Sequence, residues 1–129
     1  MRNIIMSALL VAHGWAHIWY VILSQRLIEY KDEMGWTGES WILSSLIGEP
    51  VTRHVSTLGY SLSLIGFILG GASLYMGKGW ARTIILASAA VSAATIATFW
   101  DGELSMLKEK GLIGLMVNLA VIVYFTRLK

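Results

Sequence analysis

The chain has 129 residues, of which 56% are hydrophobic and 14% are charged, and its formal net charge at neutral pH is +2. Soluble domains carry about 25% charged residues, so this composition favours a membrane protein. The small net charge argues against nucleic acid as a partner, and the absence of cysteine excludes disulfides, thiolate metal ligands and thiol nucleophiles.

Four apolar runs predict an all-α bundle of four transmembrane helices in a single integral membrane domain, residues 1–129. A helix needs about 20 apolar residues to cross the bilayer core, and unsatisfied backbone groups cannot lie in lipid. The helices are expected at residues 3–25, 51–76, 80–100 and 111–126. The last run is short, and tilt or local thinning of the bilayer accommodates the difference.

The first predicted helix carries the most informative polar residues of the chain. Four of them recur at spacings of four, three and four residues, and so share one helical face: His13, His17, Tyr20 and Ser24. Ionisable side chains at membrane depth are costly, usually face the bundle interior and mark functional sites. Trp15 and Trp19 lie on roughly the opposite face, which we expect to face lipid.

Three interpretations of the pair His13 and His17 stay open. In the first, both imidazoles are neutral and form hydrogen bonds with Ser, Thr or carbonyl groups of adjacent helices, worth about 0.6–2 kcal/mol each. In the second, they bind a metal ion or haem, because two histidines four residues apart on a helix can chelate one metal. In the third, they form a proton or quinone site, since a neutral imidazole can accept a quinol proton.

The segment between the first two helices, residues 24–53, is too long for a plain turn in so small a bundle. Its centre, Trp41–Ile47, is apolar but too short to span, and Ser40 is suited to cap a short helix there. We expect this helix to lie on the outer leaflet or across the mouth of the bundle. Trp36 and Trp41 suit the headgroup level.

The other three helices supply small and polar residues. Gly66 and Gly70 have the GxxxG spacing that lets helices approach closely, either within the bundle or in a homo-oligomer. Three hydroxyl residues follow one face of the third helix and are placed to bond with the histidines: Ser88, Ser92 and Thr95. Asn118, near the middle of the fourth helix, is a candidate partner for His13.

Four residues are candidate metal ligands: His13, His17, His54 and Asp101. Three nitrogen or oxygen ligands with an open position would suit catalytic zinc or non-haem iron. However, His17 lies about 10 Å below the membrane boundary, where His54 and Asp101 are expected. The competing interpretation is an ion cluster at the rim formed by Arg53, His54, Asp101 and Glu103.

Basic residues in short segments predict the orientation of the chain. Five fall on one side of the membrane if the chain crosses four times: Arg2, Lys78, Arg82, Arg127 and Lys129. The positive-inside rule then places both termini in the cytoplasm and opens the histidine face outward. The sequence therefore predicts a multi-pass protein of the cell membrane.

The segment Leu10–His17, which reads Leu-Val-Ala-His-Gly-Trp-Ala-His, resembles small four-helix membrane proteins of bacteria and archaea grouped as DoxX-like. Phe99–Asp101 and the glycine-containing fourth helix add to the resemblance. DoxX-like proteins include membrane subunits associated with quinone-linked oxidation of sulfur compounds. The resemblance therefore implies a quinone or electron-transfer role for the face that carries His13 and His17.

These features predict a protein that binds a quinone-like ligand or a divalent metal in an outward-opening pocket. The pocket is expected to be lined by His13, His17, Tyr20, Ser24 and Asn118. The protein would serve as a small non-catalytic subunit of a redox system or larger membrane complex. Two alternatives stay open: a membrane-embedded metalloenzyme that uses the two histidines and an outer carboxylate, and an oligomeric transporter or channel gated by histidine protonation.

Overall fold

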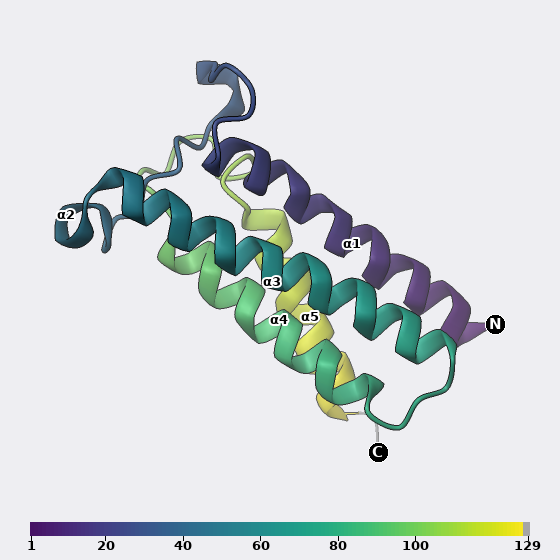
Figure 1. Ribbon diagram of the computed structural model, residues 1–129. Helices are drawn as coiled ribbons and strands as arrows, with labels where there is room; N and C mark the ends of the chain where they lie inside the picture. Colours follow the sequence, from purple (N-terminus) through teal and green to yellow (C-terminus); the bar gives the residue numbers. More distant parts are fainter. Residues whose placement is uncertain (128–129) are drawn as a thin grey trace.

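The computed structural model describes residues 1–127, and these residues contain helices but no β-strand (Figure 1). In chain order the elements are α1 (Arg2–Ser24), the 3-10 turn η1 (Asp32–Met34), α2 (Ser44–Ile47), α3 (Glu49–Tyr75), α4 (Ala81–Thr98) and α5 (Leu112–Arg127). The all-α class is therefore confirmed, and the four longer helices lie within two residues of their predicted bounds. Helices α1, α3 and α4 are long and apolar enough to cross a membrane, whereas α5 is apolar but has 16 residues.

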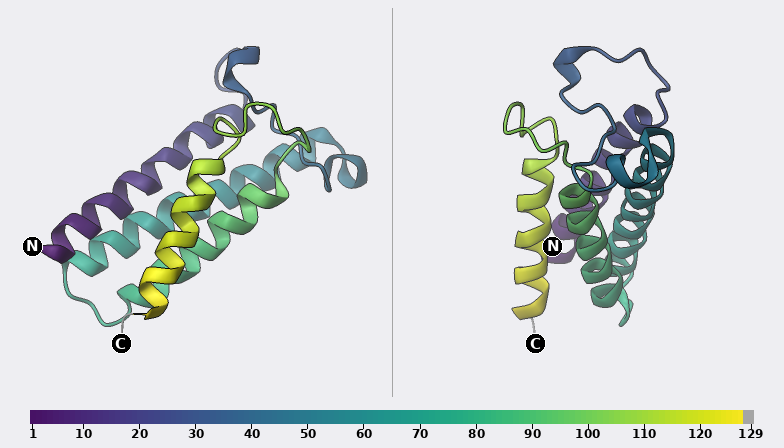
Figure 2. Two further views of the ribbon diagram at one scale, coloured as in Figure 1. Left: turned by 180° about the vertical axis from the view of Figure 1, so that it is seen from behind. Right: turned by 90° about the vertical axis from the view of Figure 1, so that its left-hand side faces the viewer.

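The four longer helices form a row in which each packs against the next. α1 packs along α3, α3 along α4, and α4 along α5. Helix α5 runs more steeply than the other three and crosses in front of α3 and α4 when the molecule is seen from behind (Figure 2). The first and last of these helices, α1 and α5, pack less closely than the three neighbouring pairs, and we call the boundary between them the seam.

Charge divides the molecule into two ends. The N-terminus, the turn between α3 and α4, and the last residues of α5 lie together at one end, which we call the basic end (Figures 1 and 2). It carries Arg2, Lys78, Arg82 and Arg127, while Lys129 lies outside the described residues. Segments 25–48 and 99–111 form the opposite end, the loop end. Seven of the eight acidic residues of the chain lie in these segments, and the eighth, Glu49, is the first residue of α3.

Small residues set the contact between α3 and α4. A Cβ atom on Gly66 would collide with the hydroxyl of Ser88, and one on Gly70 would lie 2.7 Å from Cγ1 of Ile85. The glycines therefore let the two helix backbones come closer than larger residues would allow, which is the main source of helix association in lipid. Within this chain, the GxxxG face predicted from the sequence is occupied by α4.

The segment at the loop end folds back over the bundle. The predicted helix over Trp41–Ile47 is reduced to the four residues of α2, preceded by a turn in which Ser40 Oγ accepts hydrogen bonds from the backbone of Ile42 and Leu43. Trp36 does not lie at a headgroup surface. It is 1% exposed, and its Nε1 donates to the Phe99 carbonyl at 2.7 Å, because the loop inserts this indole between helices.

Candidate functional site

The polar face of α1 is directed into the bundle, where His17 makes three hydrogen bonds, one of them to another helix. This imidazole is 3% exposed, and its Nδ1 lies 2.9 Å from the His13 carbonyl oxygen and 3.2 Å from that of Gly14. Its Nε2 lies 2.6 Å from Oγ of Ser92 on α4. Both nitrogens of His17 are therefore engaged, one by its own helix and one by a neighbouring helix.

Asn118 connects the same serine to the other histidine. The side chain is fully buried in α5, with Nδ2 2.7 Å from Ser92 Oγ and Oδ1 2.9 Å from Nε2 of His13. We call the four side chains His13, His17, Ser92 and Asn118 the histidine network. It ties α1, α4 and α5 together near the middle of the bundle.

The hydroxyls of α4 divide between local and long-range bonds. Ser88 donates to the Ile84 carbonyl and Thr95 to that of Val91, each on its own helix. Ser92 is the one of the three predicted hydroxyls that reaches the histidines. The sequence therefore predicted the correct face of α4, but which hydroxyl on that face reaches the histidines depends on how the helices pack.

Aromatic rings close the network toward the loop end. Tyr20 stacks on Tyr60 with ring centroids 4.7 Å apart, and Trp36 meets the edges of both rings. Farther in, the ring of His13 lies edge-on to Phe67 at 4.8 Å. Such stacked and edge-to-face contacts are favourable and exclude water. Trp36 and its loop thus cover the bundle mouth, where the sequence analysis expected the pocket to open.

Two cavities lie instead on the seam between α1 and α5, one on each side of His13. The polar groove has a volume of about 380 Å³ and extends toward the loop end. It is lined by His13, Ala16, His17, Trp19, Tyr20, Ile96, Lys108, Ile113, Gly114 and Val117. The apolar groove has a volume of about 530 Å³ and extends toward the basic end. It is lined by Met6, Leu9, Leu10, His13, Val117, Ala120, Val121, Tyr124 and Phe125.

Two glycines lie near the start of α5, and one of them, Gly114, lines the polar groove. A Cβ on Gly114 would lie 3.3 Å from Cδ1 of Ile96 and 3.9 Å from Cε1 of His13. Gly111 has a φ of 101°, a conformation that side chains disfavour, and its Cβ would lie 3.4 Å from the Tyr20 hydroxyl. Any larger side chain at Gly114 would therefore take up groove volume beside the histidine.

Three of the five predicted pocket residues line the polar groove: His13, His17 and Tyr20. Asn118 stands behind them in the histidine network and is buried. Ser24 belongs to a different set, since it donates to the Val21 carbonyl and lies 2.6 Å from the hydroxyl of Thr57. The helical face was predicted from spacing, but Ser24 sits where α1 meets α3 and not where it meets α5.

The predicted metal ligands do not gather in one place. His54 is exposed at the loop end beside Gln25, and Asp101 pairs with Lys110 at 2.8 Å. Within residues 1–127, no three His, Cys, Asp or Glu side chains form a group that could hold a metal ion. The predicted rim cluster is also wrong, because Arg53 pairs with Glu49 at 3.8 Å and Asp101 turns to Lys110.

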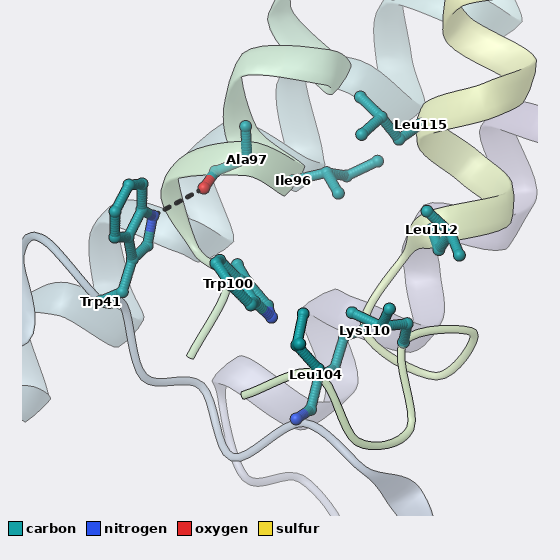
Figure 3. A pocket seen from close by; sticks show the side chains of 9 residues that line it. Trp41, Ile96, Ala97, Trp100, Leu104, Lys110, Leu112 and Leu115 are labelled. Carbon is teal, nitrogen blue, oxygen red and sulfur yellow. Dashed lines mark hydrogen bonds between the residues drawn. The ribbon is translucent and has the colours of Figure 1, made fainter. Parts of the chain in front are cut away.

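A further pocket of about 340 Å³ lies between segment 41–43 and the start of α5 (Figure 3). Its walls are Trp41, Ile96, Ala97, Trp100, Leu104, Leu107, Lys110, Leu112 and Leu115. The Trp41 indole donates to the Ala97 carbonyl at 2.9 Å.

The Lys110 side chain is 3% exposed and that of its partner Asp101 is 11% exposed, so segment 99–111 is anchored by a buried ion pair. The sequence of segment 99–111 contains charges of both signs and does not indicate which of these residues form an ion pair.

Comparison of the chain with protein-family models, with curated proteins and with solved structures found no match. These comparisons therefore give no support to the DoxX-like resemblance, which rests on the sequence features named above.

Proposed function

We propose that the chain is a multi-pass protein of the cell membrane that crosses the bilayer four times. Three helices have the length and apolar character to span, and α5 runs from the loop end to the basic end beside α4 (Figure 2). Because its 16 residues rise only about 24 Å, local thinning of the bilayer would accompany it. The exposed apolar residues Trp41, Ile42 and Leu46 suit α2 and its preceding turn to the membrane interface.

The charge distribution supports an orientation with both termini in the cytoplasm. The basic end carries no acidic residue, and basic residues in short segments are retained on the cytoplasmic side. We expect a reporter fused after Lys129 to show a cytoplasmic location and one inserted at Gly38 to show an external location. The reverse pair of signals would contradict this orientation.

We further propose that the protein binds a quinone-like ligand in the seam between α1 and α5. The observation that carries this proposal is the position of His13, which stands between a groove with polar groups and a larger apolar groove. A quinone has a flat ring with two oxygens and a long apolar tail. The ring fits beside His13, His17 and Tyr20, and the tail fits along the apolar groove toward the basic end.

The geometry favours this ligand over a metal ion. Both nitrogens of His17 and Nε2 of His13 already have partners, and the described residues supply no group of three ligands. Each groove also has an exposed apolar residue in its wall, Leu9 in the apolar groove and Trp19 in the polar groove, so a quinone dissolved in the lipid could enter from the side. We assign the protein the role of a small non-catalytic subunit of a redox system, the role that the DoxX-like resemblance also implies. Co-purification with a dehydrogenase would support that role.

Quinone binding in the polar groove is tested by a substitution that fills the groove. The side chain introduced by Gly114→Leu would occupy the polar groove beside His13, so we expect the dissociation constant for decylubiquinone to rise at least tenfold, or about 1.4 kcal/mol. Binding is measured by quenching of tryptophan fluorescence in detergent. The matched control is Gly79→Leu, because a side chain there meets open space. Equal binding by Gly114→Leu and the control, or no binding by the wild type, would contradict the proposal.

A further inference from the structure

The direction of the hydrogen bonds in the histidine network is set by His17. Its Nδ1 lies against two carbonyl oxygens, which only accept, so Nδ1 must carry the proton. An imidazolium in the hydrocarbon layer is costly, so the ring is neutral and Nε2 holds a lone pair. Ser92 Oγ, 2.6 Å away, is therefore the donor in its bond to His17.

The same reasoning passes from Ser92 to His13. Because the one hydroxyl proton of Ser92 is used, its oxygen accepts from Asn118, and the atom at 2.7 Å is the amide Nδ2. The other atom of that amide, Oδ1, accepts from Nε2 of His13 at 2.9 Å. His13 thus carries its proton on Nε2, and its Nδ1 is a bare acceptor.

The unprotonated Nδ1 of His13 faces the seam between α1 and α5. Within residues 1–127, Nδ1 of His13 has no hydrogen-bond partner, although the ring itself lines both grooves. It is also not sealed in the interior, because the buried unpaired side-chain atoms of that range are Ser7 Oγ, Thr37 Oγ1 and Arg53 Nε. The histidine therefore offers a ligand in the seam a lone pair and no proton.

We propose that the seam selects the reduced, hydroxyl-bearing form of its ligand, a quinol, over the quinone. This inference rests on the proposed function. A quinol O–H can donate to His13 Nδ1, whereas a quinone carbonyl would set a lone pair against it. The other polar groups of the groove do not reverse this preference, since the Tyr20 hydroxyl both donates and accepts, and the Lys108 ammonium donates to the oxygen of either form.

The first test compares the two oxidation states of one ligand. Purified protein in detergent is titrated anaerobically with decylubiquinol and with decylubiquinone. We expect the quinol to bind about fivefold to tenfold more tightly, the effect of one net hydrogen bond. In His13→Phe the advantage should vanish, because the ring remains without its nitrogens. In His54→Phe, the same change at an exposed histidine of the loop end, it should persist.

The outcomes separate this inference from the proposed function. Equal affinity for the two forms, or tighter binding of the quinone, would overturn the selection of quinol and leave the binding site in place. If neither form binds to the wild type, the site itself is refuted, and the selection with it.

The second test needs no substitution in the network. Nitrogen chemical shifts of ¹⁵N-labelled histidine distinguish a protonated from a bare ring nitrogen, and the chain has three histidines. We expect His13 as the Nε2–H form and His17 as the Nδ1–H form, with addition of quinol moving the Nδ1 signal of His13. His13 protonated on Nδ1 in the free protein would overturn the inference even if His13→Phe fails to fold.

Discussion

Gly66→Leu is expected to destroy the folded monomer in mild detergent. The new side chain would begin with a Cβ that collides with the Ser88 hydroxyl, and it would then have to enter the contact between α3 and α4. Overpacking of this kind costs about 1–3 kcal/mol and more where backbone must move. Separating the helices would also stretch the histidine network, because Ser92 lies one turn from Ser88 on the same helix.

Thermal melting and the elution profile in detergent measure this effect. The matched control is Ala72→Leu, which places the same leucine on the exposed side of α3. We expect Ala72→Leu to melt and elute as the wild type does. A Gly66→Leu protein that also melts and elutes unchanged would mean that α3 and α4 do not meet at this glycine.

The sequence could reveal the face that Gly66 and Gly70 share, but not its partner. Residue spacing along one helix fixes which side chains point the same way. Whether that direction leads to α4 or to a second chain depends on how helices far apart in the sequence pack. The same limit explains Ser24, which has the correct phase for the histidine face and nevertheless lies against Thr57.

The histidine site was predicted more fully than its entrance. Buried polar groups need partners, so the histidines of α1, the hydroxyl face of α4 and Asn118 of α5 were expected to meet, and Ser92 and Asn118 do bond to them. The entrance was predicted at the loop end because the polar stripe runs in that direction. The polar face of α1 alone cannot show that Trp36 inserts between the helices and closes that end. It also cannot show that a groove lies between α1 and α5.

The charged residues of segment 99–111 were the hardest to predict. Asp101 lies next to aromatic residues and Lys110 next to Gly111, so neither has a helical period that would mark it as buried. Their pairing depends on the fold of a loop, where the position of each side chain is set by the whole path of the backbone. The predicted rim cluster assumed that charges near one boundary would meet, but Lys110 lies closer to Asp101 than Arg53 or His54 does in the fold.

Lys110→Met is expected to lower the free energy of unfolding by about 3–5 kcal/mol, because it leaves the Asp101 carboxylate in a mostly buried place without its counter-charge. Thermal melting in detergent measures the loss. The matched control is Lys31→Met, which removes an exposed lysine of the loop end and should leave the melting temperature unchanged.

The double variant Asp101→Asn/Lys110→Met decides whether the loss comes from the unpaired charge. Asparagine keeps an oxygen that can accept from the Glu103 backbone, as Asp101 Oδ1 does at 2.9 Å, but it carries no charge to bury. A neutral pair at a buried site is about as stable as the ion pair it replaces, so most of the lost stability should return. If the double variant melts no higher than Lys110→Met, the anchor of segment 99–111 is the packing of the lysine stem against Trp100 and Leu104 and not its charge.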